Sequence, residues 1–211
     1  MNRRALIFDL DGVIVHTDKY HYQAWKQMAD KRSIYFDQEI NNRLRGVSRL
    51  ESLEIILERY EGEPLSQQQK EAMAEEKNEI YRDLLKTMTP DEVDPSVRET
   101  LAELRRRGCR LALGSSSKNA RFILAQTGLT DAFDAISDGT NIMNSKPDPE
   151  VFLKAAQFLG VAPGECAVVE DACAGIEAAK AGGMLAIAIG DAVCDERADY
   201  RLESFEQLLE L

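Results

Sequence analysis

The chain has 211 residues, 44% of them apolar, which is enough for one sizeable core and a smaller second one. Its formal net charge of −11 argues against nucleic acid and anionic membrane surfaces as partners. No apolar run approaches the roughly 20 residues of a membrane span, and Asp9 and Asp11 interrupt the apolar stretch near the start, so we expect no signal peptide and no membrane segment. The composition predicts a soluble, cytoplasmic protein.

The first two parts of the chain differ in pattern. Ala5–Phe8 is a short apolar run, typical of a strand buried on both faces, and Asp11-Gly12 follows it as a turn signal. Residues 17–88 carry apolar residues at helical spacing and show no strand-like alternation. Helices joined by short loops predict a small helical bundle for this part.

The third part alternates strands with helices. The expected elements, in chain order, are a helix from Pro95 that stops at Gly108, a strand Arg110–Gly114, a helix Ala120–Gln126, a strand Phe133–Ile136, a helix Pro149–Leu159, a strand Ala167–Val169, a helix Ala174–Ala181, a strand Leu185–Ile189 and a helix capped by Ser204. This order is typical of a parallel sheet with helices on both faces.

By composition the first strand belongs to this sheet, so the helical part is an insertion after strand one. We expect an α/β fold: a Rossmann-like, doubly wound parallel sheet as the catalytic core domain, residues 1–16 and 89–211, with an inserted helical-bundle cap domain, residues 17–88. The two chain crossings between these parts form a hinge, and hinged caps close over active sites.

Polar residues follow four of the predicted strands, at the edge where doubly wound sheets bind ligands. Asp9 and Asp11 come first, and two carboxylates so close at the end of a buried strand repel each other unless a cation is present. A carboxylate can also attack phosphorus to give an aspartyl-phosphate. The alternative is an ordinary acidic turn.

The other three groups fit the same chemistry. The segment 115–119 is rich in hydroxyl groups and precedes a helix, as in a phosphate-binding loop, although one serine would suffice as an N-cap. Lys146 before proline could neutralise phosphoryl charge, or be a solvated turn lysine. Glu170 and Asp171 offer hard oxygen ligands for Mg²⁺, although Asp171 could instead cap a helix.

Together these segments resemble, in order, the four motifs of the haloacid dehalogenase superfamily: Asp9-Leu10-Asp11-Gly12, Ser115, Lys146 and Glu170-Asp171. The resemblance covers the whole predicted core, and the helical insertion has the position of that superfamily's cap.

The resemblance implies roles for these residues. Asp9 would be the nucleophile and Asp11 the general acid and base, while Ser115 and Lys146 would hold the transferring phosphoryl group. Mg²⁺ would be bound by Asp9, by the main-chain carbonyl of Asp11 and by Asp171, with Glu170 binding it either directly or through a ligand of the ion. A carboxylate at position 11 favours phosphatases and mutases, in which a hydroxyl group must gain or lose a proton.

Within the superfamily, the cap resembles that of the β-phosphoglucomutase family. The matching residues of the sequence are Asp11-Gly-Val-Ile14, Tyr20-His21, Ala24-Trp25, Leu44-Arg-Gly-Val-Ser-Arg49, Lys77-Asn78 and Tyr81. By this resemblance, Thr17 lies at the hinge, and His21 and Lys77 take part in cap closure.

The resemblance also implies a substrate pocket. Arg49 would hold the phosphate that is not transferred, because its planar fork suits phosphate oxygens. The remaining substrate-binding residues would be Leu10, Trp25, Arg45, Gly46, Val47, Ser48, Lys77, Ser116, Ser117, Lys118 and Asn119. Trp25 as a core residue and Lys77 as a solvated helix residue are the structural alternatives.

The reaction that the resemblance implies interconverts β-glucose 1-phosphate and glucose 6-phosphate, with Mg²⁺ as cofactor and β-glucose 1,6-bisphosphate as intermediate and activator. A sugar-phosphate phosphatase on the same scaffold is the alternative, and a non-catalytic phosphosugar-binding protein is a third. A monomer is expected from the family. His16, where the family usually has an acidic residue, changes the charge at the hinge.

Overall fold

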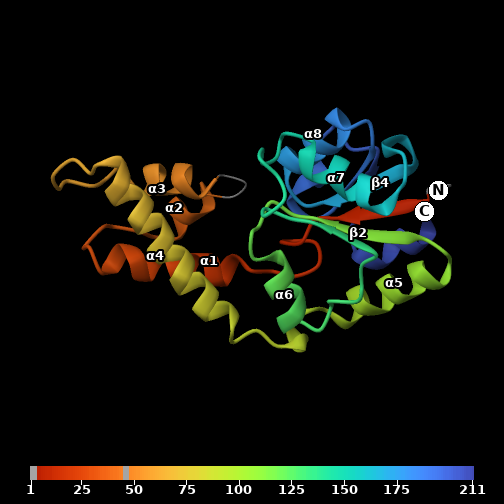
Figure 1. Ribbon diagram of the computed structural model, residues 1–211, viewed down its shortest axis with the longest axis horizontal. Coiled ribbons are helices and arrows are strands. Elements are labelled where there is room, and N and C mark those ends of the chain that lie inside the picture. Colours follow the sequence, from red (N-terminus) through yellow and green to blue (C-terminus); the bar gives the residue numbers. More distant parts are fainter. Residues whose placement is uncertain (1–3, 45–47) are drawn as a thin grey trace. The chain divides into compact units, whose positions relative to one another are not determined.

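The computed structural model describes residues 4–44 and 48–211 (Figure 1). The chain divides into two compact units, one formed by Met1–His16 with Thr89–Leu211 and the other by Thr17–Met88. We call them the sheet unit and the helical unit.

The sheet unit is built on six parallel strands in the order β3-β2-β1-β4-β5-β6. The strands are β1 (Ala5–Phe8), β2 (Arg110–Gly114), β3 (Ala135–Ser137), β4 (Cys166–Glu170), β5 (Leu185–Ala188) and β6 (Tyr200–Arg201). The order reverses at β1, which lies between β2 and β4. The predicted doubly wound parallel sheet is therefore confirmed, and its switch point lies at β1.

Helices cover both faces of this sheet (Figure 1). The α-helices are α5 (Pro95–Arg106), α6 (Ala120–Gln126), α7 (Glu150–Leu159) and α8 (Cys173–Ala181), and the 3₁₀ helices are η1 (Pro90–Glu92), η2 (Pro163–Glu165), η3 (Gly190–Cys194) and η4 (Phe205–Glu210). Helices α7 and α8 lie on one face, and α5 with η4 lies on the other. Helix α7 ends at Gly160, whose left-handed φ of 67° is the expected glycine cap.

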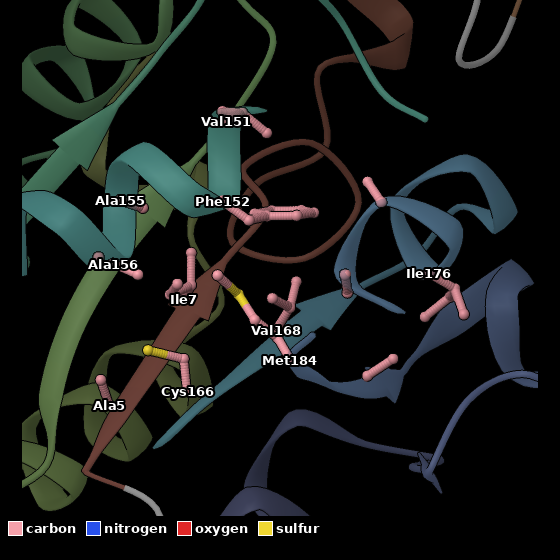
Figure 2. Packing of buried hydrophobic residues seen from close by; sticks show 14 of the residues in the cluster. Ala5, Ile7, Val151, Phe152, Ala155, Ala156, Cys166, Val168, Ile176 and Met184 are labelled. Atoms are coloured by element: carbon pink, nitrogen blue, oxygen red, sulfur yellow. The ribbon is translucent and has the colours of Figure 1, made fainter. Parts of the chain in front are cut away.

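Alternation along β1 divides its side chains between the two faces. Ile7 joins the core under α7, where it lies beside Phe152 and Val168 (Figure 2). Phe8 points to the opposite face, and its ring lies 5.7 Å from that of Phe205 in η4. Because both faces are covered, all four residues of β1 are buried, which explains why the strand is uniformly apolar.

The helical unit contains α1 (Asp18–Asp30), α2 (Gln38–Asn42), α3 (Arg49–Leu57) and α4 (Gln67–Leu85). Helices α1, α3 and α4 follow the predicted periodicity, whereas the five-residue α2 is too short for it. Ser48 and Ser66 begin α3 and α4 with capping boxes, in which the serine hydroxyl and a side chain three residues on satisfy free backbone N–H groups. Helices α1 and α4 pack together, and the unit has its own apolar core. None of the described helices is both long and apolar enough to cross a membrane.

The differences from the predicted elements are local. The third strand is Ala135–Ser137 rather than Phe133–Ile136, and the C-terminal helix is of the 3₁₀ type. The short strand β6 is absent from the prediction because it has only two residues, both exposed.

Candidate active site

Three carboxylates meet at the carboxyl ends of the two central strands. Asp9 follows β1, Glu170 ends β4, and Asp171 comes next. The backbone N–H of Asp9 donates to the carbonyl of Val169 at 3.0 Å, which holds the two strand ends together. One carboxylate oxygen from each of the three residues lies within 4.8 Å of the others. The two motifs, distant in the sequence, therefore form one cluster.

Lys146 enters this cluster from the loop between β3 and α7. Its Nζ lies 2.5 Å from Asp9 Oδ1 and also donates to Glu170 Oε1. Only 11% of its side chain is exposed, and the Nζ lies 4.7 Å from the centre of the Phe152 ring. The alternative of a solvated turn lysine is therefore wrong.

The charges of the cluster do not balance. Burial raises the pKa of Asp171 to about 8, and the negative charges of Asp9 and Glu170 add to this effect. Burial also raises the pKa of Glu170, against the opposing effect of Lys146. Although burial alone would lower the pKa of Lys146, the neighbouring Asp9 and Glu170 raise it, so this lysine is charged. With all three carboxylates ionised, the single positive charge of Lys146 leaves two negative charges uncompensated, which a divalent cation would neutralise.

Two glycines provide space around these carboxylates. A Cβ on Gly12, which has a φ of +80°, would lie 1.9 Å from Asp171 Oδ2. A Cβ on Gly175 would lie 1.9 Å from Glu170 Cδ. A divalent, oxygen-preferring ion such as Mg²⁺ fits both this charge and this donor set. Asp9, Glu170 and Asp171 are the side chains that would hold it.

Asp171 has no capping role. Helix α8 begins after Ala172, and no side chain caps it. The N-cap alternative for Asp171 is therefore wrong. Burying the Asp171 carboxylate costs free energy, and no helix cap offsets this cost. The burial is therefore better explained by the binding of a ligand.

Leu10 and Asp11 lie in the tight loop after β1. The carbonyl of Leu10 accepts hydrogen bonds from the N–H groups of Ile14 and Val15, at 2.9 and 3.1 Å. Leu10 is fully buried, main chain included, so the structure gives it a packing role and shows no exposed surface for a ligand. Asp11 is partly buried, and its carboxylate is outside the group of three.

The serine segment follows β2, the strand next to β1. Ser115 is buried, and its hydroxyl accepts a hydrogen bond from the N–H of Ser117 at 3.2 Å. The Ser117 hydroxyl accepts in the same way from the N–H of Asn119. Ser116 Oγ is buried and has no hydrogen-bond partner among the described residues, while Lys118 is exposed. The hydroxyls of Ser115 and Ser117 thus shape the turn and keep their own protons available for an acceptor.

In the helical unit, the buried Lys77 contacts the partly buried His21. Lys77 Nζ lies 2.8 Å from His21 Nδ1, and the His21 ring stacks on Tyr81 with centroids 4.1 Å apart. Burial lowers the pKa of His21 well below 6.5, and the charges of Lys77 and Arg49 lower it further, so the imidazole is neutral. The alternative of a solvated Lys77 is wrong.

Other predicted residues of the helical unit have clear packing roles. Thr17 is buried, and its Oγ1 accepts a hydrogen bond from the Tyr81 hydroxyl at 3.2 Å. Trp25 is part of the unit's apolar core, which confirms the alternative that it is a core residue. Lys77 Nζ lies 4.8 Å from the centre of the Trp25 ring. Ser48 caps α3.

Arg49 is the first residue of α3. Its guanidinium donates to Glu75 at 3.1 Å and to Asn78 at 2.9 Å, both on α4. The predicted substrate-binding residues Arg45, Gly46 and Val47 lie outside the described residues.

Sequence reasoning missed Gly175 and Glu75. A glycine inside a helical pattern is a signal of close approach, and it could have identified Gly175. Nothing in the sequence marks Glu75, because its partner lies on another helix.

Comparisons with known proteins agree with this arrangement. Residues 3–183 match the family of haloacid dehalogenase-like hydrolases. The chain is 41% identical, over 95% of its length and 92% of the relative's, to a β-phosphoglucomutase of Bacillus subtilis. It is 32% identical to a phosphorylated carbohydrates phosphatase of Thermotoga maritima, over 85% of this chain and 82% of that one. The crystal structure of a β-phosphoglucomutase from Clostridium difficile superposes with a TM-score of 0.86 at 39% identity, covering 98% of this chain and 93% of that one. The chain therefore belongs to the haloacid dehalogenase-like hydrolase family and, within it, to the family of the β-phosphoglucomutases.

Proposed function

We propose that the protein is a β-phosphoglucomutase, which interconverts β-glucose 1-phosphate and glucose 6-phosphate. The observation that carries the phosphoryl-transfer chemistry is Lys146 Nζ, which bridges Asp9 and Glu170 beside a third carboxylate, Asp171. An ammonium group bound to one oxygen of Asp9 holds that carboxylate in a fixed orientation. It also places a positive charge where negative charge develops during transfer.

In the proposed cycle, Asp9 carries the phosphoryl group as an aspartyl-phosphate. Asp11 takes the proton of the C6 hydroxyl of β-glucose 1-phosphate, the C6 oxygen attacks phosphorus, and the bond from phosphorus to Asp9 breaks. The product is β-glucose 1,6-bisphosphate. After it reorients, Asp9 attacks the C1 phosphate, Asp11 returns its proton to the departing C1 oxygen, and glucose 6-phosphate leaves.

Other residues of the sheet unit would assist this transfer. The Ser115 hydroxyl, whose oxygen already accepts from the N–H of Ser117, can donate its proton to a phosphoryl oxygen. Mg²⁺, held by the carboxylates of the cluster, would neutralise charge on the phosphoryl group.

Residues of the helical unit would bind the phosphate that is not transferred. Arg49 presents a planar guanidinium, which suits bidentate binding of phosphate. The buried Lys77 and the neutral His21 would take part in closure of the helical unit over the substrate. These roles rest on the family resemblance together with the contacts within the unit.

A sugar-phosphate phosphatase is the second candidate, because relatives with phosphatase names share 32% and 34% of their aligned residues with this chain. The two reactions differ in the acceptor of the phosphoryl group, which is a sugar hydroxyl in the mutase and water in the phosphatase. Greater identity to a mutase, at 41%, favours the first candidate.

The test measures both outcomes in one reaction. The protein is incubated with β-glucose 1-phosphate, Mg²⁺ and a trace of β-glucose 1,6-bisphosphate, while glucose 6-phosphate and free phosphate are followed in parallel. Isomerisation with little free phosphate is the expected result. Free phosphate without isomerisation would show a phosphatase. The Asp9→Asn variant should lack both activities, and substantial turnover by this variant would refute the assignment of the nucleophile.

A further inference from the structure

Arg49, Glu75 and Asn78 form a closed group of three side chains on the helical unit. Arg49 donates through Nη1 to Glu75 Oε2 at 3.1 Å and through Nη2 to Asn78 Oδ1 at 2.9 Å. Asn78 Nδ2 donates in turn to Glu75 Oε1 at 3.2 Å. Each side chain therefore contacts the other two, and the Glu75 carboxylate uses both of its oxygens.

The position of the Glu75 carboxylate has the features of a bound anion. It receives one hydrogen bond from a guanidinium and one from an amide. Phosphate oxygens accept hydrogen bonds from the same two kinds of donor. Its side chain is 61% exposed, so it can leave without opening the core, whereas the Arg49 side chain is 32% exposed. The Glu75 side chain is therefore more accessible to solvent than the Arg49 side chain that it binds.

We propose that Glu75 occupies the phosphate-binding donors of Arg49 in the free protein and is displaced by the substrate's non-transferring phosphate. The inference rests on the proposed function, since it takes the assignment of Arg49 from there. Glu75 then acts as an internal competitor that sets the affinity for substrate.

The expected effect is small but opposite in sign to structural damage. Coupling within an exposed ion pair corresponds to about a two- to fivefold change in an equilibrium constant. Glu75→Gln should therefore lower KM for β-glucose 1-phosphate by about two- to fivefold, with kcat unchanged. A residue with a merely structural role would raise KM or lower kcat when changed.

The experiment compares four variants of the full chain. Glu79→Gln is the matched control for total charge, because Glu79 is an exposed glutamate four residues further along α4. Arg49→Gln and the double variant Arg49→Gln/Glu75→Gln complete a cycle, in which Glu75→Gln should have no effect once Arg49 is absent. Binding of glucose 6-phosphate, measured by calorimetry, gives the same comparison without turnover.

The outcomes separate the inference from the proposed function. Tighter binding of glucose 6-phosphate by Glu75→Gln, absent in Glu79→Gln and in the Arg49→Gln background, supports the inference. Equal or weaker binding by Glu75→Gln would overturn it, as would an equal gain in Glu79→Gln. A protein without mutase activity would refute the proposed function alone, because the calorimetric result does not depend on turnover.

Discussion

Replacing Asp171 by asparagine should stabilise the metal-free protein and remove most of its response to Mg²⁺. Burial and the charges of Asp9 and Glu170 raise the pKa of Asp171 from 3.8 to about 8. Each pH unit between these values corresponds to about 1.4 kcal/mol, which gives an upper limit of about 6 kcal/mol for the cost of ionisation. Partial exposure and relaxation reduce this limit, so we expect a stabilisation of about 1–3 kcal/mol at pH 8.

The effect should depend on pH with a defined sign. Because the folded state holds the Asp171 proton more tightly than the unfolded state, wild-type stability falls relative to the variant as the pH rises from about 4 to about 8. Above that range the difference between the two proteins is constant. Below pH 4 both states of Asp171 are protonated, and the difference disappears.

The assay is urea unfolding followed by circular dichroism between pH 4 and pH 9, with a chelator or with Mg²⁺. Saturation at a hundred times the dissociation constant stabilises a protein by about 2.7 kcal/mol, and only the wild type should show this gain in full. Asp131→Asn, a change at an exposed aspartate of the sheet unit, serves as the control. Parallel pH profiles for wild type and Asp171→Asn would refute the electrostatic reasoning, and equal Mg²⁺ responses would refute the metal assignment.

Three further predictions follow from single contacts. Ser116→Ala should raise the free energy of unfolding by about 1 kcal/mol, because it removes a buried hydroxyl without a partner among the described residues; a loss in the same urea experiment would contradict this. Gly175→Ala should weaken Mg²⁺ binding by about ten- to a hundredfold, because the new Cβ meets Glu170 at 1.9 Å; Gly164→Ala, where a Cβ meets nothing within 4 Å, should leave it unchanged in a Mg²⁺ titration. Burial lowers the pKa of His21, so the wild type should lose stability as the pH falls below 6.5 and the unfolded state takes up a proton. In thermal unfolding, His21→Gln should lose less stability over the same pH range. Identical acid sensitivity of the two proteins would show that other groups titrate.

The site in the sheet unit could be predicted from the sequence because parallel strands bring their carboxyl ends to one edge. Asp9 follows β1 directly and Glu170 is the last residue of β4, so the strand pattern places both at the carboxyl ends of strands. Lys146 could be identified as a candidate, but its burial could not, because it lies on an irregular loop whose path depends on tertiary contacts. Its position between two carboxylates became visible only in the folded chain.

The helical unit was predictable in its secondary structure and less so in its contacts. The serines at positions 48 and 66, each followed three residues later by Glu or Gln, are local signals for helix starts, and both helices begin there. The contact between Arg49 and Glu75 joins α3 to α4, and it depends on how the two helices pack. The burial of Lys77, on α4, depends on helix packing in the same way, because its partner His21 lies on α1.

The central position of β1 has a consequence for how the chain acquires its structure during synthesis. Ala5 pairs with Arg110 on one side and with Cys166 on the other, so the strand that leads to Asp9 emerges from the ribosome about a hundred residues before its first partner. The helical unit, by contrast, is complete within Thr17–Met88 and has its own core. We expect the helical unit to fold first, while β1 stays unpaired on the growing chain. Asp9, the proposed nucleophile, thus reaches its final position only after β4 has been synthesised.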